Sequence, residues 1–141
     1  FVGHIAHLLP GHELRVEIGA AWPHPGAQGD AEVLLGPIGQ VATLRQMVTD
    51  IAFISTSSWD LRRGLTTPSA LKVEVKQVAM QSAAQVVLVA SSSKYGTFSM
   101  YRIAGLEQFD IILSDDALTP AAADSIRKQG VELLLPSDNN V

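Results

Sequence analysis

The sequence has no cysteine among its 141 residues, and this absence excludes three kinds of site. Without cysteine there is no disulfide framework, no thiolate nucleophile and no cysteine-ligated zinc. Of the four histidines, His4 and His7 would share a helical face, but His12 and His24 add no fixed ligand geometry. We therefore predict neither a metal ion nor another cofactor.

Long apolar runs and long basic runs are also missing. No uninterrupted apolar stretch approaches the ~18 residues that span a bilayer, and no charged-then-apolar signal segment opens the chain. The formal net charge is −4 and no basic run exceeds Arg62-Arg63, so the chain lacks the footprint of a nucleic-acid binder. We expect a cytoplasmic protein with no membrane partner, whose present chain does not bind DNA by itself.

The composition that remains is that of one globular domain. Apolar residues make up 47% of the chain and charged residues 17%, which excludes disorder. The chain opens at Phe1 instead of Met and enters directly on helically spaced apolar residues, which predict a helix over residues 1–9. We therefore expect residues 1–141 to be a single sensing domain taken from a longer protein.

Apolar, β-branched runs alternate with helical patterns along the rest of the chain. The predicted strands lie over residues 14–16, 31–35, 51–54, 86–90, 110–113 and 131–135. The predicted helices lie over residues 38–48, from Thr67 to about Ser82, and over 119–126 with Gly130 as the cap. Residues 17–30 read as an irregular loop, and residues 98–106 stay open between loop and short helix. The alternation predicts an α/β fold, a mostly parallel sheet with helices on both faces.

Two polar turns follow predicted strands. Ser55-Thr56-Ser57-Ser58 comes after one strand and Ser91-Ser92-Ser93-Lys94 after the next. Ligands of open parallel sheets bind at the carboxyl ends of the strands, so we expect these turns to converge on a site. The hydroxyls suit a sugar, and Lys94 suits a phosphate as a point charge. Each turn read alone is equally consistent with ordinary solvated loops.

A third candidate is Gly64-Leu65-Thr66-Thr67. Thr67 and Pro68 form an N-cap and first-turn pair, which predicts that a helix begins here. Free amides, two hydroxyls and the positive end of the helix dipole would then suit a phosphate or carboxylate. The alternative is that Thr67 merely caps the helix and Gly64 merely turns the chain.

The helix that follows has one apolar face. Its members are Leu71, Val75, Val78, Ala79 and Ser82, while Lys72, Lys76 and Gln77 are predicted to point away. Glu74 lies at the edge of this face and is either a general base or a surface residue near the helix start. Asp60 is either a base or a turn residue, and Trp59 either stacks on a sugar or anchors its loop by burial.

Together these motifs resemble the C-terminal effector-sensing domain of the DeoR family of bacterial transcription regulators. The matching segments are DIAFISTSSWD, RGLTTP, VEVK, VVLVASSSKYG and FDIILSDD, in consistent order over about residues 35–135. The resemblance implies the fold shared by ribose-5-phosphate isomerase A and the CoA transferases, and a sensor for a phosphorylated sugar or sugar acid. It also implies a homo-oligomer, either dimer or tetramer, and an upstream helix–turn–helix DNA-binding domain that this chain lacks.

The family motifs can be carried over residue by residue. Its Gly-Ala-Asp-Gly turn falls on residues 55–58, its Gly-Leu-Thr-Thr on 64–67, its Glu-x-x-Val-Lys on or near Glu74 and Lys76, and its Asp-Ser-Ser-Lys-Phe-Gly on 91–96. Ser57 stands where related isomerases use an aspartate for acid–base work, and serine without a paired base does not supply it. The ligand-binding residues that the resemblance implies are Ser55, Thr56, Ser57, Gly64, Leu65, Thr66, Thr67, Glu74 and Lys94, with no catalytic residue.

Two departures from the family pattern concern the first part of the chain. The family's first strand and phosphate loop are expected before Phe1, and another helix and strand are expected between Val16 and Ala31, so we predict that residues are omitted there.

Two other functions stay open beside the sensor. One is a sugar-phosphate isomerase of the same fold with Glu74 or Asp60 as base, and the other is a domain that only oligomerises.

Overall fold

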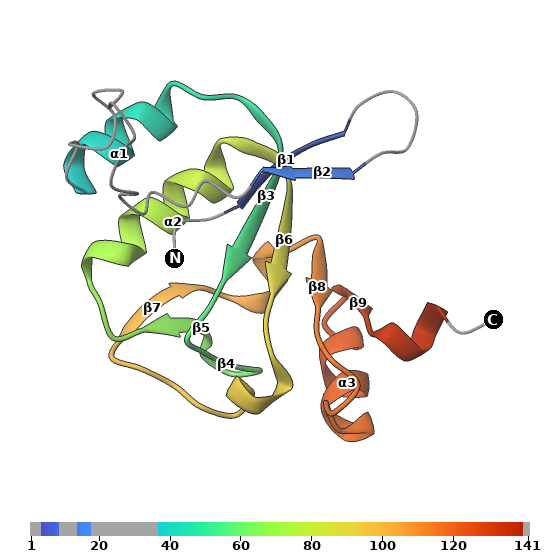
Figure 1. Cartoon of the computed structure of the whole chain (residues 1–141). Helices are drawn as coiled ribbons and strands as arrows, with labels where there is room; N and C mark the ends of the chain where they lie inside the picture. Colours follow the sequence, from blue (N-terminus) through green and yellow to red (C-terminus); the bar gives the residue numbers. More distant parts are fainter. Residues whose placement is uncertain (1–3, 9–13, 18–36, 140–141) are drawn as a thin grey trace, which may run out of the picture.

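A computed structural model describes residues 4–8, 14–17 and 37–139. Its centre is a six-stranded sheet with the strand order β2-β1-β3-β6-β8-β9 (Figure 1). β3, β6, β8 and β9 are parallel, whereas β1 is antiparallel to both of its neighbours, β2 and β3. The strands are β1 (His4–Leu8), β2 (Leu14–Glu17), β3 (Thr49–Ser55), β6 (Ala83–Val89), β8 (Ile111–Leu113) and β9 (Glu132–Leu134). The mostly parallel α/β sheet that the sequence predicts is confirmed.

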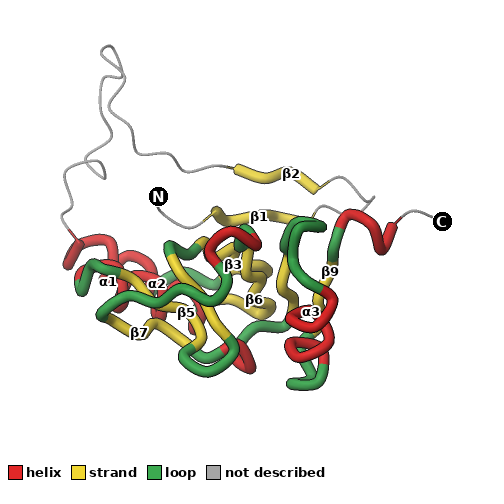
Figure 2. Tube along the Cα trace, turned by 90° about the horizontal axis from the view of Figure 1, so that it is seen from below, coloured by secondary structure: helices red, strands yellow, loops and turns green. Residues whose placement is uncertain are grey.

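Three α-helices accompany the sheet in the described part of the chain. They are α1 (Pro37–Arg45), α2 (Leu71–Gln81) and α3 (Pro120–Arg127). α3 begins as its sequence predicts, because the Thr119 hydroxyl accepts a hydrogen bond from the Ala122 amide and Pro120 occupies the first turn. α2 and α3 both contribute side chains to one apolar cluster, so they pack on the same face of the sheet (Figure 2).

A small antiparallel sheet of three strands packs beside α2. Its strands are β4 (Ser58–Asp60), β5 (Gly64–Thr67) and β7 (Tyr101–Ala104), in the order β4-β5-β7. Gly64 has φ +73°, and a Cβ at this position would lie 2.1 Å from the carbonyl oxygen of Ala104. Only glycine permits both this backbone conformation and the close approach of β5 to β7.

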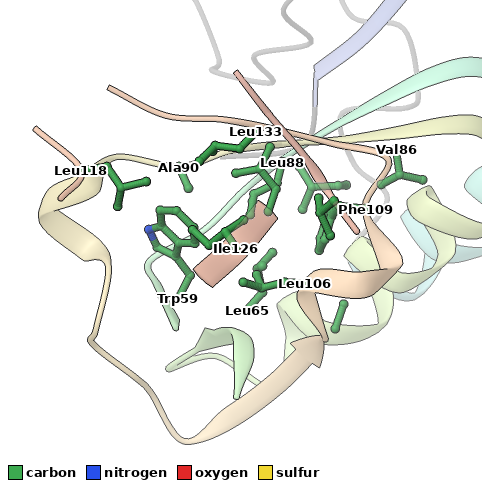
Figure 3. Packing of buried hydrophobic residues seen from close by; sticks show 14 of the residues in the cluster. Trp59, Leu65, Val86, Leu88, Ala90, Leu106, Phe109, Leu118, Ile126 and Leu133 are labelled. Atoms are coloured by element: carbon green, nitrogen blue, oxygen red, sulfur yellow. The ribbon is translucent and has the colours of Figure 1, made fainter. Parts of the chain in front are cut away.

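The main core joins the two sheets to α3 (Figure 3). Trp59 of β4 has no exposed surface, and it lies among residues that include Leu88 of β6 and Ile126 of α3. Its Nε1 donates to the carbonyl of Ser91 at 2.9 Å, and its ring meets that of Tyr95 edge to face at 4.8 Å. Trp59 is therefore a buried anchor, as one of its two interpretations predicts, and it fixes β4 to the turn after β6.

Several boundaries differ from the sequence prediction. The helix expected over residues 1–9 is wrong, because residues 4–8 form β1 and pair with strands on both sides. A short apolar run is compatible with both the helical and the strand period, and here the pairing with β2 and β3 selects the strand. The segment 98–106, for which the alternatives were a loop and a short helix, instead contains the strand β7, and the polar turn after β3 contains the strand β4. The strand predicted over 31–35 and most of the loop predicted over 17–30 lie outside the described residues.

The predicted start of α2 is also wrong. Gly64–Thr67 is β5, paired with β4 on one side and β7 on the other, and the helix begins at Leu71. Long-range pairing therefore overrides the local Thr-Pro signal. The predicted faces of α2 change with it, since Leu71 is 67% exposed and Lys76 only 8%.

Candidate functional site

The side chains of two lysines form hydrogen bonds with the backbone at the end of β3. Lys94, in a short 3-10 helix after β6, donates from Nζ to the carbonyl oxygen of Thr56 at 3.1 Å. Lys76, on α2, donates from Nζ to the carbonyl oxygen of Ser55. Because β3 and β6 are parallel neighbours that pair Ser55 with Val89, the two polar turns predicted to converge do lie together.

Lys76 is the residue of this site that the sequence prediction left out. It was expected to point away from the apolar face of its helix, whereas the structure buries it. Burial, and then the positive charges of Lys72 and Lys94, lower the pKa of Lys76 to about 8. The available signal was the Glu-x-x-Val-Lys motif, which falls on or near it by resemblance.

The two ammonium groups have no acidic partner in the part of the chain that the structure describes. The ion pairs of that part join Arg45 to Glu74, Arg63 to Asp60 and Arg127 to Asp138. Lys76 and Lys94 instead meet backbone carbonyls, which carry no net charge. Each ammonium has three donors, so one bond to a carbonyl leaves donors for a further acceptor. The arrangement suits a small anion.

A network of buried hydroxyls adjoins the lysines. The Thr56 hydroxyl donates to the carbonyl of Ser58 at 2.8 Å, and the Ser58 hydroxyl lies 2.7 Å from that of Thr66. All three residues are at most 5% exposed. Their hydroxyls therefore hold the turn and β5 in place, while Ser57 of the same turn is exposed and Ser55 is half-buried. Ser57 is the member of this turn best placed to meet a ligand from solvent.

The segment Gly64–Thr67 does not form the expected anion-binding helix start. Its backbone belongs to the small sheet, and the Thr67 hydroxyl accepts a hydrogen bond from the Ser69 amide at 3.3 Å. Both Leu65 and Thr67 are almost fully buried. The helix dipole that was expected to act here begins instead at Leu71, whose cap residue Ala70 makes no side-chain hydrogen bond.

Neither candidate base is placed for proton transfer. Glu74 has a side chain 61% exposed and pairs with Arg45 of α1 at 3.1 Å, so it does not join the lysines as predicted. Burial raises the pKa of Asp60, but hydrogen bonds and charge from Arg63 outweigh burial, and the net pKa is lowered. A general base that works near neutral pH needs the opposite shift.

The turn that carries Lys94 is fixed from the next strand. Asp115, after β8, accepts from the Ser92 amide at 2.8 Å and from the Ser92 hydroxyl. These two hydrogen bonds are the main reason that the pKa of Asp115 is lowered to about 2. Asp115 therefore holds the turn that carries Lys94 in position.

One known protein family matches most of this chain. Residues 28–116 match the family of DeoR C-terminal sensor domains. The chain therefore belongs to this family.

Individual relatives are transcription regulators by name. Over 100 residues, or 70% of the chain, it is 42% identical to an uncharacterized HTH-type transcriptional regulator of Haemophilus influenzae and 39% identical to the regulator YgbI of Escherichia coli. Over 85 residues, or 60% of the chain, it is 34% identical to the deoxyribose operon repressor of Escherichia coli. The matched part covers 39% of the length of the first two relatives and 34% of the third.

Proposed function

We propose that this chain is the effector-sensing part of a DNA-binding transcription regulator and is not an enzyme. Its effector is a small phosphorylated sugar or sugar acid, bound at the carboxyl ends of β3 and β6. The observation that carries the proposal is the pair Lys76 and Lys94, two ammonium groups directed at consecutive carbonyls with no acidic partner among the described residues. One relative is named a deoxyribose operon repressor, which fits an effector derived from a sugar.

The charges decide what kind of ligand fits. A buried ammonium without a counter-ion is unfavourable, and an anion that approaches it relieves that cost. The lowered pKa of Lys76 reflects this unfavourable state. A neutral sugar would leave the buried charge of Lys76 uncompensated, whereas an anion can meet both Lys76 and the exposed Lys94, so the proposed ligand is anionic. Ser57, exposed on the same turn, supplies a hydroxyl for the polyol.

Regulation then follows from differential binding. An effector shifts only an equilibrium between states that it binds unequally. The DNA-binding segment belongs to the longer protein, and paired subunits are expected because DNA half-sites come in pairs. The domain acts as a homo-oligomer in which the bound anion changes how subunits or domains are arranged.

The test is a thermal-shift screen of the chain against triose, pentose and hexose phosphates, sugar acids and their unphosphorylated parents. A ligand at about 100 times its dissociation constant adds about 2.7 kcal/mol, which raises Tm by several degrees. We expect a phosphorylated or acidic compound to stabilise the wild type and not Lys94→Ala. Lys128→Ala, an exposed lysine after α3, is the matched control and should behave as wild type. Equal stabilisation of all three proteins would contradict the role of Lys94.

A further inference from the structure

The small sheet carries a second group of cations around a pocket of about 590 Å³. Arg62, Arg63 and Arg102 line this pocket, and Phe98 and Met100 form its apolar wall. The two apolar residues are 60% and 83% exposed. Pockets of about 300–1,000 Å³ are typical of small-molecule sites, so the volume suits a metabolite.

One of the three arginines is fixed and neutralised. Arg63 donates from Nη1 to Oδ2 of Asp60 at 2.9 Å, and its guanidinium lies 3.9 Å from the ring centroid of Phe98. Arg62 and Arg102 are exposed, and the ion pairs of the described residues do not include them. The pocket therefore offers the guanidinium groups of Arg62 and Arg102 without acidic partners among the described residues. They line the same pocket as the ring of Phe98, over which the guanidinium of Arg63 lies.

The pocket is distinct from the lysine pair. Neither Lys76 nor Lys94 lines it. Between them lies the hydroxyl network. The Thr66 hydroxyl, beside the pocket, accepts a hydrogen bond from the Ser99 amide at 2.8 Å, and on the other side the backbone carbonyl of Thr56 accepts one from Lys94. Because this network is buried and internally bonded, a ligand in the pocket meets a different set of groups.

We propose that the arginine pocket binds a phosphate ester that carries an aromatic group, the chemistry of a nucleotide. Arg62 and Arg102 hold the phosphate, since a guanidinium presents a planar fork of donors that matches phosphate geometry. Phe98, with Arg63 over one face, provides a platform of the kind on which bases stack, and Met100 extends it. A phosphate without an aromatic group would leave this apolar wall in water.

The test uses titration calorimetry of the chain with three probes: adenosine 5′-monophosphate, adenosine and inorganic phosphate. We expect the nucleotide to bind more tightly than either fragment. The double variant Arg62→Gln/Arg102→Gln should weaken nucleotide binding by about tenfold or more, because two charge-assisted contacts are lost. Phe98→Ala should weaken the nucleotide and leave phosphate unchanged. Arg127→Gln, an exposed arginine on α3, is the control and should bind as wild type.

Three results would overturn the proposal. The first is no heat of binding for the nucleotide up to millimolar concentration with correctly folded protein. The second is equal binding of nucleotide and phosphate, which would remove the aromatic platform from recognition. The third is nucleotide binding that survives in the double arginine variant and disappears in Lys94→Ala, which would move the nucleotide to the lysine pair. Because the effector screen depends on Lys94 and this test on the arginines, the two proposals succeed or fail separately.

Discussion

Replacing Lys76 with methionine removes the buried charge while keeping an unbranched apolar stem of similar length. The pKa of Lys76 falls from 10.5 to about 8 in the folded chain. One pKa unit corresponds to about 1.4 kcal/mol, so holding Lys76 protonated lowers the free energy of unfolding by about 3 kcal/mol at pH 7. Loss of the bond to Ser55 offsets part of this gain, and we expect a net stabilisation of about 1–3 kcal/mol for Lys76→Met.

The assay is thermal unfolding as a function of pH. For a domain of this size 1 kcal/mol moves Tm by about 3–5 °C, so a stabilisation of about 1–3 kcal/mol should raise Tm roughly 3–15 °C above wild type at pH 7. The folded pKa of Lys76 lies below its unfolded value, so between about pH 8 and pH 10.5 the unfolded chain binds more protons and wild-type stability rises with pH. The difference in Tm between Lys76→Met and the wild type should therefore disappear above about pH 10.5.

Lys128→Met is the matched control, because Lys128 is exposed after α3 and is not among the charges that lower the pKa of Lys76. The free energy of unfolding of this control variant should stay within about 0.5 kcal/mol of the wild-type value. A lower Tm for Lys76→Met at pH 7 would refute the reasoning, as would a gap that persists unchanged to high pH. The variant should also lose stabilisation by the anionic effector, so a gain in stability should accompany a loss of function.

Three further predictions concern residues around the site. Gly64→Ala should destabilise the chain far more than Gly96→Ala in urea titrations, because both have positive φ but only a Cβ at 64 strikes the backbone of Ala104; equal effects would contradict the close approach of β5 to β7. The pKa of Asp115 is lowered to about 2 from 3.8, so the stability it contributes is present above pH 4 and lost toward pH 2. Calorimetry should show that the stability of Asp115→Asn depends less on pH between about pH 4 and pH 2 than that of the wild type. The same loss of stability in both proteins would contradict a stabilising role of the Asp115–Ser92 hydrogen bonds. Glu74→Gln should leave effector-dependent melting shifts intact, since its exposed ion pair lies apart from the lysines; loss of the shift would restore Glu74 to the site.

The sequence could predict the elements whose signals are local and strong. The parallel strands β3, β6, β8 and β9 follow from apolar runs that suit a sheet packed on both faces, and α3 follows from Thr119-Pro120. The convergence of the Ser55 and Lys94 turns also follows, because parallel neighbours end at one edge. These inferences depend on residues close in sequence and on general rules of topology.

What the sequence could not predict depends on distant partners. Gly64–Thr67 carries a good helix-start signal, yet it pairs with β4 and β7, the latter more than thirty residues away along the chain. Lys76 reads as a solvated residue on the helical wheel because its site is made by Ser55 of another element. Glu74 is exposed and forms an ion pair with Arg45 of α1, a partner 29 residues earlier that the local sequence does not indicate. Each error assigns a residue by local pattern where tertiary contacts decide.

The positions of the two lysines explain how the site can be ready for an anion before one arrives. Each ammonium uses one donor on a backbone carbonyl at the end of β3, and two donors remain. The carbonyls are fixed because β3 pairs with β6, and the Lys94 turn is fixed by Asp115 and by Trp59. Binding of the proposed anion would therefore require little ordering of the protein, and the anion would relieve the unfavourable burial of Lys76. The buried charge of Lys76 lowers the stability of the folded chain and would favour binding of an anion. Lys76→Met removes this charge, so it should both stabilise the fold and weaken effector binding.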